Sequence, residues 1–352
     1  MTERRGSALR PSERIKCPVV SLLDRVRRSW KADVANLGGN KRVRDLMTIF
    51  KRASRVVDLV ALSLLAVVVP PYAGGVPCAF AANAVLFGAY DPSETLGSIG
   101  RVSIDHIFVS WRHIDVASLR AAGNRAAARH RTLLITMEPW NGAAAWTSGG
   151  DQRLSEVAAG ASDLTIRSDC APLAGIPTEV IVRWGHEMDD ATGRYPWANQ
   201  SSADYVSAFR HFVDLCRRTA PRVKFMWSPD GNWSAGVYYP GADYVDYVGL
   251  SDFGLQKWDL DHGGKARSFA DSLRNAYGRV ASLGKPVILA EFGAAGDDGY
   301  RQKFICDATH ASSEFPLLKA VIYFNRVETY HWPAPYGSPD WRIPASLVSP
   351  CL

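Results

Sequence analysis

Short apolar segments alternate with longer helical segments through residues 82–352, and this alternation constrains the fold most. Residues 203–219 space their apolar side chains three and four apart, as an amphipathic helix does. Residues 266–283 share this spacing and end before Gly284, a residue typical of helix C-termini. Eight strands, each followed by a helix, predict a parallel sheet covered by helices. The eight apolar segments expected to be strands are 85–90, 106–111, 132–138, 179–185, 223–228, 245–251, 286–291 and 319–325.

The length of this region favours one closed barrel. Its 271 residues are close to the roughly 250 of a typical (β/α)8 barrel. A doubly wound open sheet gives the same alternation, but the segment after the first strand, DPSETLGSIG, lacks the GxGxxG dinucleotide fingerprint. The predicted fold class is therefore α/β, a single (β/α)8 TIM barrel over residues 82–352, preceded by a signal peptide.

Residues 1–81 differ in charge from the rest of the chain. They hold 15 Lys/Arg and 6 Asp/Glu, whereas residues 82–352 hold 26 and 29. An apolar run of 14 residues, 56–69, follows basic residues and precedes Ala79-Phe80-Ala81, which fits the small-x-small pattern of a signal-peptidase site. The run is shorter than the roughly 20 residues of a membrane span. We expect residues 47–81 to be a cleaved signal peptide and the mature protein to be secreted or periplasmic.

Residues 1–46 have two interpretations. A start at Met47 already supplies a short basic segment before the apolar run, so residues 1–46 would be an extension upstream of the true start. The alternative is a genuine basic tail for nucleic acid or an anionic membrane surface, but the segment contains no recognisable nucleic-acid-binding module. We expect a monomer with no nucleic-acid partner and no stable membrane insertion after signal cleavage.

Four cysteines, Cys170, Cys216, Cys306 and Cys351, remain after the expected cleavage. An exported protein meets an oxidising compartment, which permits disulfides. Four cysteines allow three connectivities, and the sequence does not choose among them; one bridge with two free thiols also fits. No Cys/His spacing indicates a metal site, and we expect neither a metal nor an organic cofactor.

Two glutamates stand at the ends of predicted strands, where barrel active sites lie. The fourth strand runs into Glu187 and the seventh ends in Glu291. Alternate residues of a strand share a face, so we expect Glu291 to lie on the same face of its strand as Val287 and Leu289. If the fourth strand stays extended, Glu187 lies on the same face as Arg183. Such a pair suits glycosidic bonds: one carboxyl protonates the leaving oxygen, and the other attacks or activates water. A separation of about 5–5.5 Å gives retention and about 6.5–9.5 Å inversion, and the sequence does not fix it.

Aromatic and polar side chains accompany the two carboxylates. The flat faces of tryptophans beyond strand ends can stack on sugar rings. The segment HEM at residues 186–188 does not begin the zinc-binding motif HExxH, because Asp190 stands where the second His is required. The sequence also lacks the GxSxG motif of serine hydrolases. The strand-end residues expected to contact substrate are Glu138, Trp140, Arg183, His186, Trp197, Trp227, Asp252, Phe253 and Asn325.

These segments resemble glycoside hydrolase family 26, the β-mannanase family of a retaining clan with catalytic glutamates on barrel strands four and seven. The resemblance implies that Glu187 is the acid/base and Glu291 the nucleophile. It also implies that His186 is the histidine preceding the acid and Trp140 an aromatic that contacts substrate. The similar segments, over about residues 85–325, are ITMEPW, VRWGHEMDDATGRYPW, SADYVSAFRHFVDLCR, VKFMWSPDGN, YYPGADYVDYVGLSDFG, KPVILAEFG and AVIYFN.

The sixth strand departs from the family pattern. The family commonly has GLDGY where this chain has GLSDF. Phe253 replaces a tyrosine whose hydroxyl bonds the nucleophile, Ser251 replaces an aspartate, and the eighth strand ends in YFN rather than WFN. These changes lie beside the sugar-binding floor, so they weaken the expectation of plain mannan more than that of double-displacement chemistry.

The combined expectation is an exported retaining endo-β-glycanase that hydrolyses a β-linked polysaccharide. Candidate substrates are mannan, mixed-linkage β-glucan and an exopolysaccharide of the producing cell. The alternative is a barrel that binds glycan without cleaving it, and the presence of both glutamates argues against that alternative.

Overall fold

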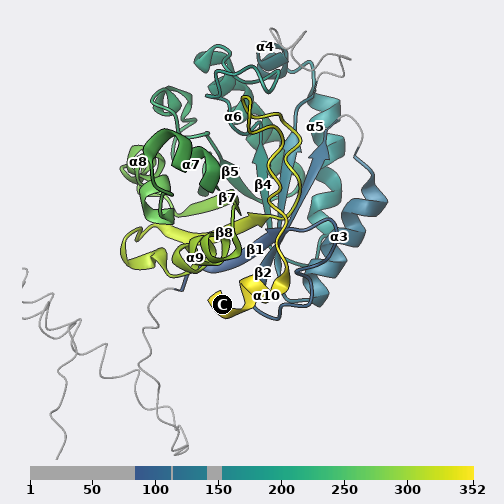
Figure 1. The fold of residues 1–352 in the computed structure, drawn as a ribbon. Coiled ribbons are helices and arrows are strands. Elements are labelled where there is room, and N and C mark those ends of the chain that lie inside the picture. The colour runs from purple at the N-terminus through teal and green to yellow at the C-terminus, as the bar shows by residue number, and fades with distance from the viewer. Residues whose placement is uncertain (1–83, 112–113, 141–152) are drawn as a thin grey trace, which may run out of the picture. The chain divides into compact units, whose positions relative to one another are not determined.

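The computed structural model describes residues 84–111, 114–140 and 153–352. Eight parallel strands close into a barrel in chain order (Figure 1), which confirms the predicted TIM-type fold. The expected extension at residues 1–46 and signal peptide at residues 47–81 lie outside the described residues. The strands are β1 Leu86–Tyr90, β2 Val102–Ser110, β3 Thr132–Glu138, β4 Val180–Trp184, β5 Lys224–Trp227, β6 Tyr247–Leu255, β7 Val287–Ala295 and β8 Leu318–Phe324.

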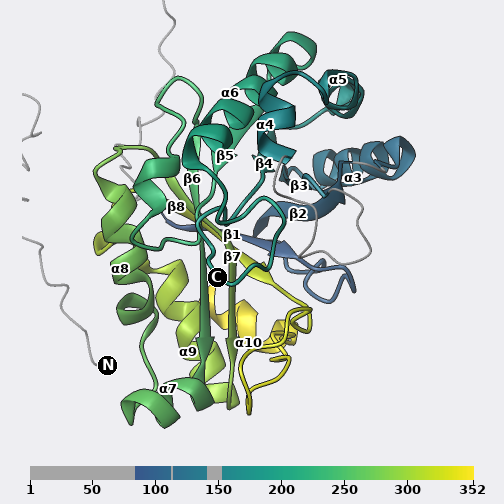
Figure 2. The same cartoon turned by 90° about the horizontal axis from the view of Figure 1, so that it is seen from above.

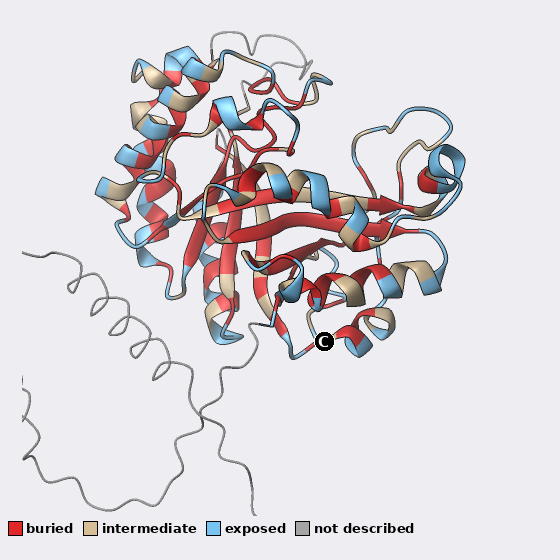
Figure 3. Cartoon of the chain, turned by 90° about the vertical axis from the view of Figure 1, so that its left-hand side faces the viewer, coloured by how far each residue is buried: buried red, intermediate tan, exposed pale blue. Residues whose placement is uncertain are grey.

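Helices surround the strands, with buried inner faces and exposed outer faces (Figure 3). None of the helices described is long and apolar enough to cross a membrane. The helices are α3 Val116–Ala128, α4 Arg153–Ala158, α5 Asp163–Cys170, α6 Ser202–Thr219, α7 Gln256–Gly263, α8 Phe269–Ala281, α9 Asp298–Thr309 and α10 Ala345–Val348, with short 3₁₀ turns η1 Ala171–Gly175, η2 Ala235–Tyr238, η3 Ala311–Ser313 and η4 Ser349–Cys351.

The expectation of a helix after every strand was wrong at two connections. The β1–β2 connection, residues 91–101, contains no helix, and the β5–β6 connection contains only η2. The first is rich in Gly, Ser and Pro, which favour turns over helices. The two helices predicted from apolar spacing are present as α6 and α8.

Apolar side chains fill the lower barrel. The strands' alternation directs one residue set inward and the other toward the helices. β1 contributes Gly88, and a Cβ there would lie 2.8 Å from side-chain atoms of Ile104 and Ile322, so only glycine fits this close approach. The barrel is therefore a packed core, open to ligands only at its rim. We call its inward residues, Ile104, Leu134, Ile181, Met226, Ile288, Ala290, Ala320 and Ile322, the interior cluster.

Strands β6 and β7 continue four residues past their predicted ends. Their parallel pairing runs on to Leu255 and Ala295, and the two strands lie side by side as they approach α7 (Figure 2). The sequence pattern missed this extension because residues 252–255 and 292–295 include glycine and aspartate rather than an unbroken apolar run.

The four cysteines form two disulfides in the helical layer. Cys170 of α5 bonds Cys216 of α6, and Cys306 of α9 bonds Cys351 of η4. The structure thus selects one of the three connectivities that the sequence left open. Each bridge closes a loop of about 45 residues and ties two elements of the outer layer together.

Candidate active site

A layer of polar side chains lies just above the interior cluster. His106, Thr136, Arg183 and Ser228 each follow a cluster member by two residues, so they share its inward face. The Arg183 side chain is fully buried. Its Nε donates to Ser228 Oγ at 2.8 Å and its Nη1 to Thr136 Oγ1 at 3.4 Å. Since a buried charge needs partners, these hydroxyls help to hold a fixed positive charge beneath the barrel mouth.

Glu291 reaches the barrel mouth through a β-bulge in β7. Leu289 belongs to the outer core and Ala290 to the interior cluster. The pairing with β6 then skips one residue, so that Ser251 pairs with Glu291. A bulge re-aims the side chain that follows it, and here it turns Glu291 inward. The expectation that Glu291 shares the face of Val287 and Leu289 was therefore wrong.

Glu187 reaches the same mouth by leaving its strand. β4 ends at Trp184, and Gly185 and Glu187 both adopt left-handed backbone conformations, with φ of 53° and 52°. For a residue with a side chain this conformation costs about 1–3 kcal/mol, and it concentrates at functional sites. The Glu187 amide donates to the Ser228 carbonyl at 2.7 Å, which holds the turn. The extended path from Arg183 to Glu187 considered from the sequence is absent.

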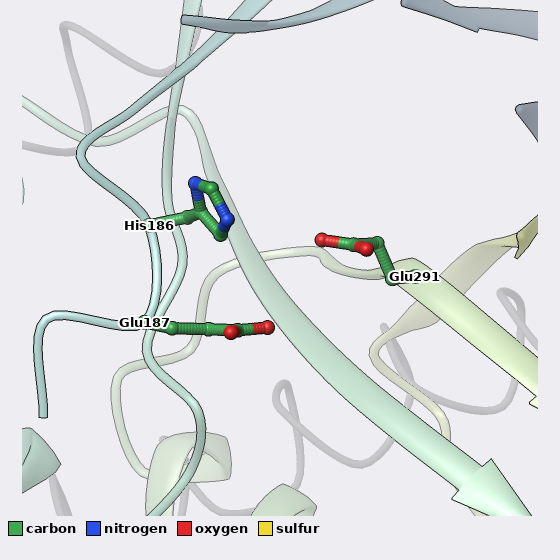
Figure 4. Close-up of side chains that lie close together, drawn as sticks. All are labelled: His186, Glu187 and Glu291. Atoms are coloured by element: carbon green, nitrogen blue, oxygen red, sulfur yellow. The ribbon is translucent and has the colours of Figure 1, made fainter. Parts of the chain in front are cut away.

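Arg183 and Ser251 link the two carboxylates. Arg183 Nη1 donates to Glu291 Oε1 at 2.5 Å, and its Nη2 donates to Ser251 Oγ at 3.3 Å. Ser251 Oγ in turn donates to Glu187 Oε1 at 2.5 Å. Arg183 Nη2 also lies 3.7 Å from Glu187 Oε1. The two carboxylates point toward one another, Glu187 from the turn after β4 and Glu291 from β7 (Figure 4), and one oxygen of each lies within 4.8 Å of the other.

Burial and the neighbouring charges act in different directions on the pKa of Glu291. Burial raises the pKa of the Glu291 carboxyl to about 7; Arg183 opposes the rise and Glu187 adds to it. The Arg183 guanidinium is nearer to Glu291 than to Glu187, so it favours the negative charge at Glu291.

His186 completes the group at the mouth. Its ring has no exposed surface, and neither ring nitrogen has a hydrogen-bond partner. Burial, with Arg183 adding to the effect, lowers the pKa of His186 well below its usual value, so the ring is neutral. His186, Glu187 and Glu291 offer ligand atoms within 4.8 Å of one another, the spacing of a metal site. The Arg183 cation already serves both carboxylates and would repel a metal ion there.

A cavity of about 200 Å³ opens beside Glu291 on the side of β8, β1, β2 and β3. Aromatic rings make up half of its lining, with three charged side chains in addition to Glu291. Its size and lining suit a ring with hydroxyl groups on its edge. The cavity is lined by Tyr90, Phe108, Glu138, Trp140, Arg194, Tyr195, Glu291, Phe324, Arg326 and Thr329.

Two residues predicted to contact substrate line this cavity, and three are buried beneath the rim. Glu138 and Trp140 line it, and the Trp140 Nε1 donates to Glu138 Oε2 at 3.0 Å. Arg183, Trp197 and Trp227 are fully buried, and none of them lines the cavity. Arg183 positions carboxylates, and the Trp197 Nε1 donates to the His186 carbonyl at 2.6 Å. Trp227 packs outside the barrel.

Three further predicted contacts are used within the fold. Asp252 turns outward and accepts from the Ser272 hydroxyl of α8 at 2.5 Å. Phe253 packs against Trp341, with ring centroids 4.8 Å apart. The Asn325 amide donates to Asp91 and Thr95 and accepts from the Ile343 amide, which satisfies it completely. Strand-end position alone therefore did not separate substrate-facing residues from structural ones.

Sequence reasoning missed several residues at the mouth. Phe108 follows the inward-facing Ile104 by four residues in β2, but the predicted strand began only at residue 106 and so did not include Ile104. Arg194, Tyr195 and Arg326 lie in loops, where no periodicity indicates direction. Ser251 was noted only as a departure from a family pattern, whereas it bonds directly to Glu187.

Comparison with known proteins finds one matching family and several similar enzymes. The profile of glycosyl hydrolase family 26 matches residues 151–290, which include Glu187 and end one residue before Glu291. Endoglucanase H of Acetivibrio thermocellus is 28% identical over 264 residues, 70% of this chain and 26% of that protein. Beta-1,3-xylanase TXYA of Vibrio sp. is 29% identical over 221 residues, 56% of this chain and 47% of that one. The chain spans about a quarter to a half of these relatives.

Solved structures agree with the fold. GH26C from Muricauda sp. MAR_2010_75 gives a TM-score of 0.56 at 16% identity, covering 73% of this chain and 83% of that one. A modular endo-beta-1,4-mannanase from Cellulomonas fimi gives a TM-score of 0.56 at 16% identity, covering 77% of this chain and 70% of that one. At this identity the likeness supports the barrel architecture alone.

Proposed function

Because this chain belongs to glycosyl hydrolase family 26, and so to the glycoside hydrolases, we propose that it is an exported endo-β-glycanase that retains anomeric configuration. The observation that carries the proposal is the pair of carboxylates at the barrel mouth, Glu187 and Glu291, bridged by Arg183 and Ser251. Three segments distant in the sequence, at residues 183–187, 251 and 291, meet there with complementary charges and hydrogen bonds.

The proposed reaction is a double displacement. Glu291, ionised beside Arg183, attacks the anomeric carbon while Glu187 protonates the departing glycosidic oxygen, and a covalent glycosyl-enzyme forms. Glu187 then takes a proton from water as the water attacks the same carbon, releasing the sugar and restoring Glu291.

The separation of the carboxylates favours retention over inversion. One oxygen of each lies within 4.8 Å of the other. Retaining enzymes hold their carboxyls about 5–5.5 Å apart, whereas inverting enzymes leave about 6.5–9.5 Å for a water molecule. The short distance supports Glu291 as the nucleophile.

Export is supported by the disulfides. Both pairs, Cys170–Cys216 and Cys306–Cys351, require an oxidising compartment, in keeping with residues 47–81 acting as a cleaved signal peptide. The proposed substrates are mannan, mixed-linkage β-glucan and the exopolysaccharide of the producing cell, to which the names of the relatives add β-1,3-xylan.

A panel of these polysaccharides, with product sizes analysed, tests the proposal. Glu291→Ala should abolish hydrolysis while leaving the fold intact. Glu187→Ala should cleave only substrates with good leaving groups and should gain rate when azide replaces the missing base. Glu314→Ala is the matched control, because that glutamate is exposed and pairs only with Arg274. Hydrolysis retained by Glu291→Ala would remove its role, and binding without any hydrolysis would favour the non-catalytic alternative.

A further inference from the structure

An unpaired arginine stands at the rim of the cavity beside Glu291. Arg326 follows β8 by two residues, is exposed, and lines the cavity together with Tyr90. Its Nη1 donates to the Tyr90 hydroxyl at 3.2 Å. No carboxylate in the described ranges lies within ion-pair distance of Arg326. The Tyr90 bond steadies the guanidinium without neutralising it.

A second guanidinium in the same cavity is held rigidly. Arg194 Nη2 donates to Glu328 Oε1 at 3.1 Å, and its Cζ lies 5.2 Å and 5.3 Å from the ring centroids of Tyr195 and Tyr330. Glu328 is itself buried and also accepts from the Trp341 indole at 3.3 Å. Its negative charge is thus committed to the protein, while the Arg194 guanidinium still borders the cavity.

The negative charge opposing these arginines is weak. Among the residues that the structure describes, Glu138 is the one cavity-lining carboxyl besides Glu291. Burial raises the pKa of Glu138, which favours its neutral form, and the Trp140 indole fixes its orientation. Away from the reacting carboxylates, the cavity wall therefore carries more positive than negative charge. Residues 82–352 as a whole carry three more acidic than basic residues, so this local excess runs against the domain's balance.

We propose that this cavity binds a sugar that carries a carboxylate, and that Arg326 selects it. The proposal rests on the proposed function and names its substrate class: an acidic β-linked polysaccharide with a uronic-acid residue on the nucleophile's side of the cleaved bond. A neutral hydroxyl needs no formal charge opposite it, whereas the planar fork of an unpaired guanidinium matches a carboxylate in both geometry and charge. Tyr90 leaves the other nitrogens of Arg326 available for that contact.

Matched neutral and acidic substrates test the proposal. Oligosaccharides of β-1,4-mannan and mixed-linkage β-glucan are compared with derivatives whose C6 hydroxymethyl groups are oxidised to carboxylates. We expect a higher kcat/KM for the carboxylated member. Arg326→Gln should lower the acidic-to-neutral ratio of kcat/KM at least about tenfold, as the loss of one charge-assisted hydrogen bond implies. Arg326→Lys keeps the charge but loses the planar guanidinium, so its ratio should lie between those of wild type and Arg326→Gln.

A control arginine and ionic strength separate selection from general charge effects. Arg222 is exposed, precedes β5 at the far end of the barrel, and donates only to the Ala174 carbonyl, at 3.0 Å. Arg222→Gln should leave the ratio unchanged. The wild-type ratio should fall as ionic strength rises from about 0.01 M to about 1 M, because the Debye length shortens from about 30 Å to about 3 Å.

Each outcome decides between the two proposals. Two results overturn the substrate assignment and leave the glycanase proposal standing. One is Glu291-dependent hydrolysis of the neutral members at an equal or higher rate. The other is an acidic-to-neutral ratio of kcat/KM that Arg326→Gln does not change. If nothing is hydrolysed, calorimetric binding to the protein decides. Arg326-dependent binding of the carboxylated members alone supports the carboxylate site and refutes the glycanase. Absence of both binding and hydrolysis overturns both.

Discussion

Replacing Glu291 with glutamine is expected to stabilise the folded protein at alkaline pH and to leave its stability unchanged at acidic pH. Burial raises the pKa of this carboxyl from 4.5 to about 7 in the folded protein. The unfolded chain therefore releases this proton at lower pH than the folded protein does. Between the two values the folded state binds more protons, so the free energy of unfolding falls as pH rises through this window.

The size of the effect follows from the two pKa values. At about 1.36 kcal/mol for each pH unit, the rise from 4.5 to about 7 corresponds to about 3 kcal/mol of stability lost above pH 7. Glutamine has nearly the shape of a protonated glutamate and never ionises. Arg183 keeps Glu187, Ser251 and Thr136 as partners in the variant. The Glu291→Gln protein should therefore be up to about 3 kcal/mol more stable at about pH 8 and equal to wild type at about pH 4.

Urea unfolding followed by tryptophan fluorescence, repeated across this pH range, measures the difference. The control is Glu314→Gln, because the Glu314 side chain is exposed and pairs with Arg274, so its removal should change stability little at any pH. A stability difference between Glu291→Gln and wild type that stays constant with pH would refute the reasoning. So would a Glu291→Gln variant that is less stable than wild type at about pH 8.

Two further predictions concern the site network and the disulfides. Ser251→Ala should lower kcat/KM by at least about tenfold, since a hydrogen bond to a charged group contributes about 1.5–3 kcal/mol. The Ser251 hydroxyl holds Glu187 in position, so an unchanged kcat/KM would contradict this role. Replacing Cys170 and Cys216 together by serine should cost about 4 kcal/mol in urea unfolding, from the 46-residue loop that the bridge closes; a cost below about 1 kcal/mol would contradict that value.

The amino-acid sequence determined the barrel and the identity of its two mouth carboxylates. Strand and helix periodicities are local properties, so eight short apolar segments and the helical spacing of 203–219 were enough to predict a parallel barrel. A strand's carboxyl end is also a position in the sequence. Glu187 and Glu291 could therefore be selected as a pair without coordinates, because both stand at the ends of predicted strands.

Only the tertiary structure decided how those carboxylates meet and what surrounds them. The bulge that turns Glu291 inward depends on its pairing with β6, and the left-handed turn at Glu187 on the Ser228 carbonyl, which comes from another strand. Trp197, Asp252 and Asn325 stand at strand ends but serve the fold, because their partners come from distant segments. Side-chain direction beyond a strand end is set by such non-local contacts, and no local periodicity encodes it.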